Sequence, residues 1–439
     1  MFKKITSLVL VAAMLFTFVA CGGDKTEDDR DYSAYTAVPY EAGTDIYDAY
    51  KALVAGKDLS NIKIGAIMIG DDEEGYTKAH HDGLTKMAEN LGISEDQIII
   101  KWTIPESAEC TTAANELVGE GCTIIFANSF GHEDYLIEAA RQHPEVQFCH
   151  ATGYQAASSG LSNLTNYFNN VYESRYVSGI YAGEKLNEMA AKDPSIVENG
   201  KITIGYVGAF TYAEVISGYT SYLLGVRSVC DYEVEMKVKF TGSWASQELE
   251  YDTAMDLIDE GCVLISQHAD TTGAAAAAAE KGVYDVGYNV SMIQAGGDHA
   301  ITSATLNWGV YYTYAVANFV AGNKLATDWS EGYKTGAVKI TEVNKAAFET
   351  AEAYNAAVTA ANAAIQGFID GTLQVFDTSK FTVGGQAVTS TVALEGFNGL
   401  EYIKTSGGVT YFAESTLASA PAFALEIDGI TLLNRNYGN

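Results

Sequence analysis

The polar side chains best placed to bind a small molecule come directly after short apolar runs of the chain. Such runs are typical of strands in an open parallel sheet, and ligands bind at the carboxyl ends of those strands. Carboxylate, amide and imidazole groups at this edge can hydrogen-bond a ligand. The residues in question are Asp71, Asp72, Asn128, His268, Asp270 and Asn289.

Aromatic rings recur in the same loops, and positive charge does not. Lys and Arg are absent from every loop that follows an apolar run. Phosphate recognition usually recruits Arg, Lys or a glycine-rich loop, so a phosphorylated ligand is disfavoured. The pattern predicts a pocket that holds a flat, neutral or weakly polar molecule by stacking and a few hydrogen bonds. The rings are those of Tyr76, Phe130, Tyr154, Phe210, Tyr212 and Trp244.

No known catalytic motif accompanies these loops. The sequence contains no GxSxG, HExxH or P-loop pattern, and the segment from Gly205 to Gly208 lacks the GxGxxG spacing. The absence of CxxC and CxxH pairs argues against a zinc site. We therefore expect no enzyme activity, no catalytic residue, no metal and no cofactor.

Three further groups of polar residues have simpler interpretations. His80 and His81 are adjacent, so on a helix they point about 100° apart, and we expect both on a solvated surface. Glu173 and Arg175 are expected to form an ion pair within a helix. His268 and Asp270 either hydrogen-bond the ligand or stabilise their own loop through an Asx-type turn.

Strand-like and helix-like segments alternate over residues 62–303. Most of the apolar runs are short and rich in β-branched residues, as expected for strands buried on both faces. This alternation predicts an α/β fold in which parallel sheets are flanked by helices and joined by right-handed crossovers. The strands are expected at 62–69, 97–101, 122–127, 146–150, 201–207, 234–240, 262–266, 284–288 and 300–303.

A long helix predicted at 168–192 interrupts the alternation of strands and helices. We interpret it as the point where the chain crosses from one lobe to the other. We expect a first lobe of residues 58–170 plus about 304–375, and a second lobe of 171–303 plus about 376–439. Chain crossings between the lobes are expected near Phe168–Val171, Ser303–Leu306 and Gln374–Asp377.

The N-terminus carries an export signal. Lys3 and Lys4 precede an apolar run that is too short to span a membrane, and residues 1–20 are therefore a signal peptide. Cys21 follows a small residue in a pattern that resembles a lipobox, so it is the expected site of lipid attachment. Residues 21–57 are interpreted as an acidic linker between the lipid and the fold. The protein is thus expected on the outer face of a bacterial cell membrane.

The charge of the chain excludes one class of partner. The formal net charge is −30, which argues against binding to nucleic acid. Apolar residues make up 48% of the chain, enough for each lobe to bury a core. Cys122, Cys149 and Cys262 lie within or beside apolar runs and are expected to be buried as small hydrophobes.

Several segments in sequence order resemble the basic membrane lipoproteins, the Bmp or PnrA-like group of substrate-binding lipoproteins of ABC transporters. The resemblance implies a type I periplasmic-binding-protein fold, with two α/β lobes and a ligand cleft between them. It also implies a purine nucleoside or nucleobase as ligand and a membrane permease as partner. The matching segments are 69–84, 138–154, 166–183, 204–210, 242–273, 280–292 and 302–312.

The resemblance also implies roles for particular residues. Tyr76 and Trp244 match the two aromatic positions that sandwich the base in the family. Thr77, Asn289 and Asn307 depart from the family pattern, and the positions that engage ribose are not retained. A free nucleobase such as hypoxanthine is therefore at least as good a candidate as a nucleoside. The expected ligand-binding set is Tyr76, Asp72, Asn128, Phe130, Trp244, His268, Asp270 and Asn289.

Two other hypotheses about function compete with that of a transport-linked binding protein. An exported enzyme on the same scaffold would need a nucleophile and base, which the motifs do not supply. A surface lipoprotein that binds another small ligand, or a host or matrix macromolecule, would expose an aromatic patch away from the cleft.

Overall fold

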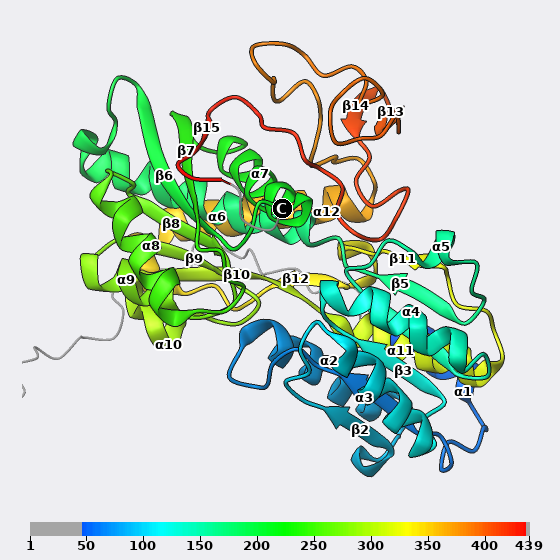
Figure 1. Cartoon of the computed structure of the whole chain (residues 1–439). Helices are drawn as coiled ribbons and strands as arrows, with labels where there is room; N and C mark the ends of the chain where they lie inside the picture. The colour runs from blue at the N-terminus through cyan, green and yellow to red at the C-terminus, as the bar shows by residue number, and fades with distance from the viewer. Residues whose placement is uncertain (1–45, 436–439) are drawn as a thin grey trace, which may run out of the picture.

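The protein is described by a computed structural model over residues 46–435, and it folds into two α/β lobes (Figure 1). The signal peptide and Cys21 lie outside the described residues. Residues 46–57 were expected in a linker, but helix α1 (Ile46–Val54) packs on the first lobe, where Tyr50 contacts Tyr314 with ring centroids 5.7 Å apart. The apolar face of α1 explains why this segment joins the fold.

The first lobe is built on a six-stranded sheet of order β11-β5-β4-β3-β1-β2, in which all neighbours are parallel. Three of its six strands are buried along their whole length, because helices cover both faces. The strands are β1 (Ile64–Ile67), β2 (Ile98–Lys101), β3 (Ile124–Ala127), β4 (Gln147–Ala151), β5 (Leu164–Tyr167) and β11 (Asp328–Trp329). The helices are α2 (Gly75–Leu91), α3 (Ala108–Gly119), α4 (Glu133–Gln142), α5 (Ala156–Ser159) and α11 (Trp308–Ala321).

The second lobe holds a seven-stranded sheet of order β12-β10-β9-β8-β6-β7-β15, parallel except for the β10–β12 pair. Its strands are β6 (Lys201–Gly208), β7 (Glu233–Phe240), β8 (Leu264–His268), β9 (Tyr284–Tyr288), β10 (Ala300–Leu306), β12 (Val338–Ile340) and β15 (Ile430–Leu432). Its helices are α6 (Val171–Lys192), α7 (Ala213–Arg227), α8 (Gln247–Asp259), α9 (Gly273–Lys281), α10 (Ile293–Gly296) and α12 (Ala351–Ile369).

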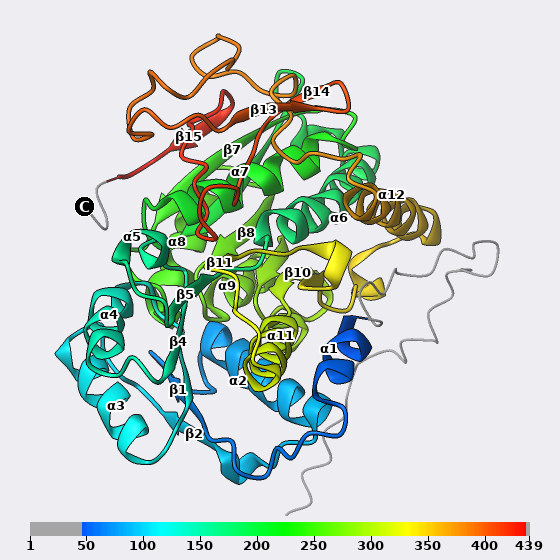
Figure 2. The ribbon, with the colours of Figure 1, turned by 90° about the vertical axis from the view of Figure 1, so that its right-hand side faces the viewer.

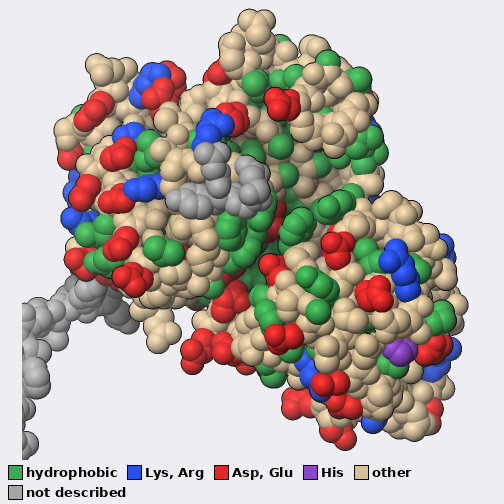
Figure 3. All heavy atoms as spheres, in the orientation of Figure 1, with side chains coloured by type: hydrophobic (Ala, Val, Ile, Leu, Met, Phe, Trp, Pro, Cys, Tyr) green, Lys and Arg blue, Asp and Glu red, His purple; other side chains and the backbone are tan. Residues whose placement is uncertain are grey.

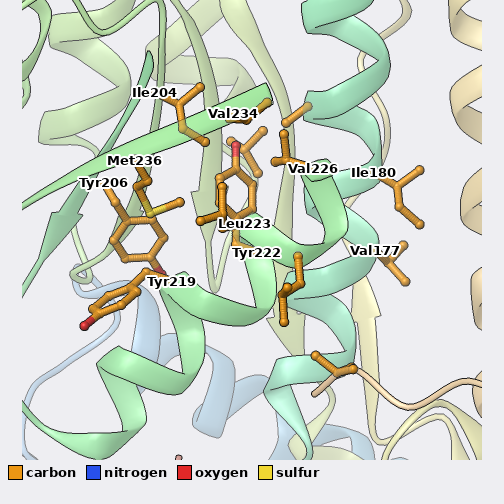
Figure 4. Packing of buried hydrophobic residues seen from close by; sticks show 14 of the residues in the cluster. Val177, Ile180, Ile204, Tyr206, Tyr219, Tyr222, Leu223, Val226, Val234 and Met236 are labelled. Atoms are coloured by element: carbon orange, nitrogen blue, oxygen red, sulfur yellow. The ribbon is translucent and has the colours of Figure 1, made fainter. Parts of the chain in front are cut away.

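The core of the second lobe depends on the close packing of α6 against α7. A Cβ atom at Gly179 would clash with the carbonyl oxygen of Tyr222, and one at Gly225 would clash with that of Tyr176. Glycine at both positions lets the two backbones approach (Figure 4). The opposite side of α7 places Tyr222 and Leu223 over strands β6 and β7.

The chain passes between the lobes three times, and two of the passages lie where the sequence predicts them. These follow Tyr167 at the end of β5 and Leu306 at the end of β10. The third lies between β11 and β12, at residues 330–337, and not at 374–377. The expected first-lobe boundary near 375 is therefore wrong: β12 pairs with β10, and α12 packs on α6 in the second core.

Residues 372–435 lie over the second lobe (Figure 2). This segment forms a hairpin of β13 (Ile403–Ser406) and β14 (Val409–Phe412), and β15 then adds to the free side of β7. The segment also touches the first lobe, because the backbone amide of Ser419 donates to Asp328 Oδ1 at 3.0 Å.

Cys110, Cys122, Cys149 and Cys262 are buried as free thiols, and Cys230 is a partly buried one. This confirms the expectation for the three cysteines beside apolar runs. Within residues 46–435, no helix combines the length and the apolar character needed to cross a bilayer.

Asp285 generates a prediction about stability. It lies fully buried in β9, and neither carboxyl oxygen has a hydrogen-bond partner among residues 46–435. Burial raises its pKa to about 8. The folded protein therefore keeps a proton that the unfolded chain loses above about pH 4, so the stability falls as the pH rises from about 4 to about 8.

We expect Asp285→Asn to stabilise the protein by on the order of 1–3 kcal/mol at pH 8, with a smaller gain at pH 5. Urea unfolding at both pH values measures the difference, and Asp252→Asn, an exposed change on α8, is the control. Equal effects of Asp285→Asn at both pH values would contradict this explanation.

Candidate ligand-binding site

A cavity of about 240 Å³ lies between the lobes, where the carboxyl ends of the two sheets face each other. Figure 3 shows hydrophobic side chains gathered in the hollow between the lobes. Five of the eight residues predicted from the sequence line this cavity. They are Tyr76, Asn128, Phe130, Trp244 and Asp270.

The other three predicted residues lie outside the cavity wall. Asp72 is exposed and pairs with His81 Nδ1 at 2.8 Å. His268 is fully buried beneath the cavity, and Asn289 is buried behind Asp270, donating from Nδ2 to Asp270 Oδ1 at 2.7 Å. His268 and Asn289 thus support residues that line the cavity.

The start of α2 positions Tyr76. Glu74 caps the helix by accepting hydrogen bonds from the amides of Tyr76 at 2.6 Å and Thr77 at 3.1 Å. The Tyr76 hydroxyl donates to the carbonyl oxygen of Asn128 at 2.6 Å. The edge of the ring also meets His80, with centroids 4.6 Å apart. These contacts hold the ring in one orientation against the cavity.

His80 is not on a solvated surface, contrary to the expectation from sequence. It is fully buried, its ring is stacked on Trp308 at 4.0 Å, and its Nδ1 lies 2.6 Å from the Tyr312 hydroxyl. Burial lowers the pKa of His80 well below its usual value, so the ring is neutral. His81 does face outward, because the two rings diverge as helix geometry requires.

Five aromatic rings form a row that passes from the first lobe to the second. Successive centroids along the row are 6.1, 5.8, 5.4 and 5.3 Å apart. The row crosses from the first lobe to the second where Phe130 contacts Tyr212. In order, the rings are Tyr154, Phe130, Tyr212, Phe210 and Trp244.

Two acidic side chains from the second lobe face the cavity. Glu214, at the start of α7, has an oxygen 3.3 Å from His268 Nε2, and Asp270 follows β8. Burial raises the pKa of Glu214 to about 7, against the opposing effect of Arg175. Burial and neighbouring carboxylates raise the pKa of Asp270 well above its usual value. Burial also lowers the pKa of His268 well below its usual value, so that ring is neutral.

Arg175 and Glu173 do not form the expected ion pair. Arg175 is fully buried, donates from Nη1 to the carbonyl oxygen of Gln267 at 2.5 Å, and lies 3.7 Å from the centroid of the Tyr288 ring. Glu173 instead accepts from the amide of Tyr333 at 2.7 Å. The guanidinium thus sits behind Tyr288, and not on the cavity surface.

The lobes are in contact beside the cavity. The backbone amide of Gly75 donates to the carbonyl oxygen of Asp270 at 3.1 Å, which joins the start of α2 to the loop after β8. A Cβ atom at Gly75 would lie 3.1 Å from the same oxygen and 3.4 Å from Val290. The arrangement is a closed one, and it depends on the small size of residue 75.

The sequence analysis missed several lining residues. Tyr288 is the last residue of a predicted strand, so restricting the search to the loops excluded it. Glu214 lies two residues beyond the end of such a loop. Asp71 was named among the polar loop residues but not in the expected ligand-binding set, and it also lines the cavity. The lining residues that the sequence analysis did not name are Ile69, Gly70, Glu74, Ser129, Thr152, Glu214, Ala245 and Tyr288. Among the described residues, no three His, Cys, Asp or Glu side chains gather as a metal site.

The chain resembles known transport proteins in sequence. A purine-binding protein of Brucella abortus (strain 2308) is 30% identical over 297 residues, which cover 66% of this chain and 79% of that protein. A putative ABC transporter glucose-binding protein of Haloferax volcanii is 33% identical over 219 residues, about half of either chain.

Solved structures confirm the fold. An ABC transporter solute-binding protein from Conexibacter woesei matches with a TM-score of 0.57 at 16% identity, covering 71% of this chain and 98% of that one. A transcriptional activator of the comK gene from Bacillus halodurans matches with a TM-score of 0.55 at 19% identity, covering 69% and 98%. The chain therefore has the two-lobed α/β architecture of type I periplasmic binding proteins, as expected.

A family model extends these similarities over most of both lobes. The model of the PnrA-like ABC transporter substrate-binding proteins, Bmp, matches residues 65–369. This range runs from β1 to the end of α12 and includes every residue that lines the cavity. The chain therefore belongs to the Bmp family of PnrA-like ABC transporter substrate-binding proteins.

Proposed function

We propose that this chain is the solute-binding lipoprotein of an ABC importer and that its ligand is a purine base. The observation that carries the proposal is the cavity itself, enclosed by both lobes and walled by Tyr76, Phe130 and Trp244. Aromatic walls suit a planar ring, and no Lys or Arg among the described residues lines the cavity. The purine-binding relative in Brucella abortus supports the same ligand class.

The residues near the cavity favour a base over a nucleoside. The cavity of about 240 Å³ has room for a purine ring system. The departures from the family pattern at Asn289 and Asn307 remove side chains that would engage a ribose, because Asn289 is engaged with Asp270 and Asn307 with Tyr47.

The transport cycle needs no change in the ligand. A base enters the open cleft, contacts both lobes and stabilises the closed state, which the membrane permease recognises. Lipid on Cys21 would hold the protein at the outer face of the membrane, close to that permease. The contact between Gly75 and Asp270 belongs to the closed state of this cycle.

Glucose is a second candidate ligand, because a relative at 33% identity is named as a putative glucose-binding protein. Carboxylates can accept hydrogen bonds from sugar hydroxyls, and aromatic rings can cover the apolar face of a sugar. Thermal-shift screening of hypoxanthine, guanine, adenine, inosine and glucose separates the ligand classes. Stabilisation by glucose alone would overturn the proposal of a purine.

The two predicted stacking rings give a direct test. We expect Tyr76→Ala and Trp244→Ala each to weaken the binding of the base that stabilises the protein, by about tenfold or more, because a stacked ring contributes ~1–3 kcal/mol. Calorimetric titration measures the loss, and Tyr232→Ala, at a partly exposed ring that does not line the cavity, is the control. Unchanged affinity in both variants would remove Tyr76 and Trp244 from the site.

Closure can be tested at Gly75, which does not itself line the cavity. Gly75→Val places a branched side chain against Asp270 and Val290, so we expect it to hold the lobes apart and to weaken base binding by about tenfold. Small-angle scattering with the base present should show a more open protein than wild type. Gly119→Val is the matched control, because nothing lies within 4 Å of a Cβ atom there. Wild-type affinity in Gly75→Val would show that binding does not require this contact.

A further inference from the structure

The hydrogen-bonding capacity left in the cavity is mostly that of acceptors. Glu214 has one oxygen 3.3 Å from His268 Nε2, and no described residue donates to its other oxygen. Asp270 accepts from Asn289 through Oδ1, and no described residue donates to Oδ2. Each carboxyl group therefore keeps an oxygen for a ligand.

Other polar groups that line the cavity are already engaged with the protein. Both oxygens of Glu74 accept from the backbone at the start of α2. Asn128 Oδ1 accepts from the amide of Ile69 at 2.9 Å, and Ser129 donates to Glu106 at 2.6 Å. These residues shape the wall and contribute little to the choice of ligand.

Tyr288 lines the cavity, but its hydroxyl does not face a ligand. The hydroxyl has no hydrogen-bond partner among the described residues, and it is buried from the cavity as well as from solvent. In the second lobe, the side-chain oxygens left for a ligand are therefore those of Glu214 and Asp270. Asp71, from the first lobe, also lines the cavity but is exposed to solvent.

We infer that Glu214 and Asp270 select a planar ligand whose edge carries adjacent N–H donors, which among the purine bases is guanine. This inference rests on the proposed function and narrows it. Guanine presents N1–H and a 2-amino group side by side, so its edge complements the free oxygens of the two carboxyl groups. Adenine instead presents an acceptor at N1. A carboxylate cannot donate a hydrogen bond to this nitrogen, so N1 stays unpaired and the two acceptors repel each other.

Because Glu214 can ionise, we expect the affinities for guanine and for adenine to change with pH in opposite directions. Burial raises the pKa of Glu214 to about 7, so near neutral pH the group exchanges between its two forms. Paired N–H donors favour the carboxylate, so guanine affinity falls as the pH drops below about 7. Adenine pairs with the protonated acid and gains over the same range. The titratable and charged groups around Glu214 are Arg175, Tyr76, Tyr206, His268, Asp270 and Tyr288.

The experiment is a titration of the full mature protein with guanine and with adenine, at pH 6 and pH 8, followed by tryptophan fluorescence. We expect the wild type to prefer guanine by at least about tenfold at pH 8 and by less at pH 6. Glu214→Gln keeps one oxygen for His268 and turns the end that faces the ligand into an N–H donor, which matches the N1 acceptor of adenine. This variant should lose guanine affinity and gain adenine affinity, and Asp270→Asn should lower the guanine preference.

Glu248→Gln, an exposed change on α8, is the control and should behave as wild type. Thermal melting of each ligand-free variant shows whether it is folded, and the pH series on the wild type tests the inference without any variant. Equal binding of both bases by the wild type would overturn the inference and leave the proposed function standing. So would an equal loss of both bases in Glu214→Gln. The proposed function fails as well if the folded wild type binds neither base and is stabilised by no purine in the thermal-shift screen.

Discussion

The hydrogen bond from the Gly75 amide to the Asp270 carbonyl joins the two lobes beside the cavity, and the character of the site depends on this contact. When the lobes meet here, the cavity is enclosed and the nearby carboxyl groups lose water. Desolvation then raises the pKa values of Glu214 and Asp270. The contact between the lobes and the raised pKa values of these carboxyl groups are therefore coupled. A molecule that donates hydrogen bonds to these oxygens would stabilise the arrangement in which they are buried.

A buried cationic side chain, Arg175, lies near the acidic side chains of the site. Arg175 is buried behind Tyr288, and its charge opposes the rise in the pKa of Glu214. Burial, and after it the same charge, lowers the pKa of His268, so this ring is neutral where it contacts Glu214. A buried guanidinium near two buried acids costs free energy unless all three groups are satisfied.

The C-terminal segment has a different role from the two lobes. It lies beyond the residues matched by the family model, and it protects the outer strand of the second sheet, because β15 pairs with β7. Glu414 fixes the segment to α7 by accepting from Ser217 at 2.6 Å and from the amide of Phe423. Ser419 extends this contact to Asp328 in the first lobe, so the segment links both lobes at a distance from the cavity wall.

The sequence could predict the alternation of strands and helices, because local periodicity determines which segments form a buried parallel sheet. It could also predict the loops at the cavity and the aromatic residues in them. Tyr76 and Trp244 were found in this way. The sequence could not place α12, since an alanine-rich helix can pack on either core and long-range contacts decide between them. Nor could it separate Asp270, which faces the cavity, from Asp72, which faces solvent, because both follow a strand.

The sequence by itself therefore determined the architecture and the loops whose aromatic rings line the cavity. The tertiary structure alone decided which other side chains line that cavity, buried His80 and His268 as supports, and brought Glu214 and Tyr288 to its wall. The physical reason is that these outcomes depend on contacts between segments far apart in the chain, across two lobes, which no local pattern encodes.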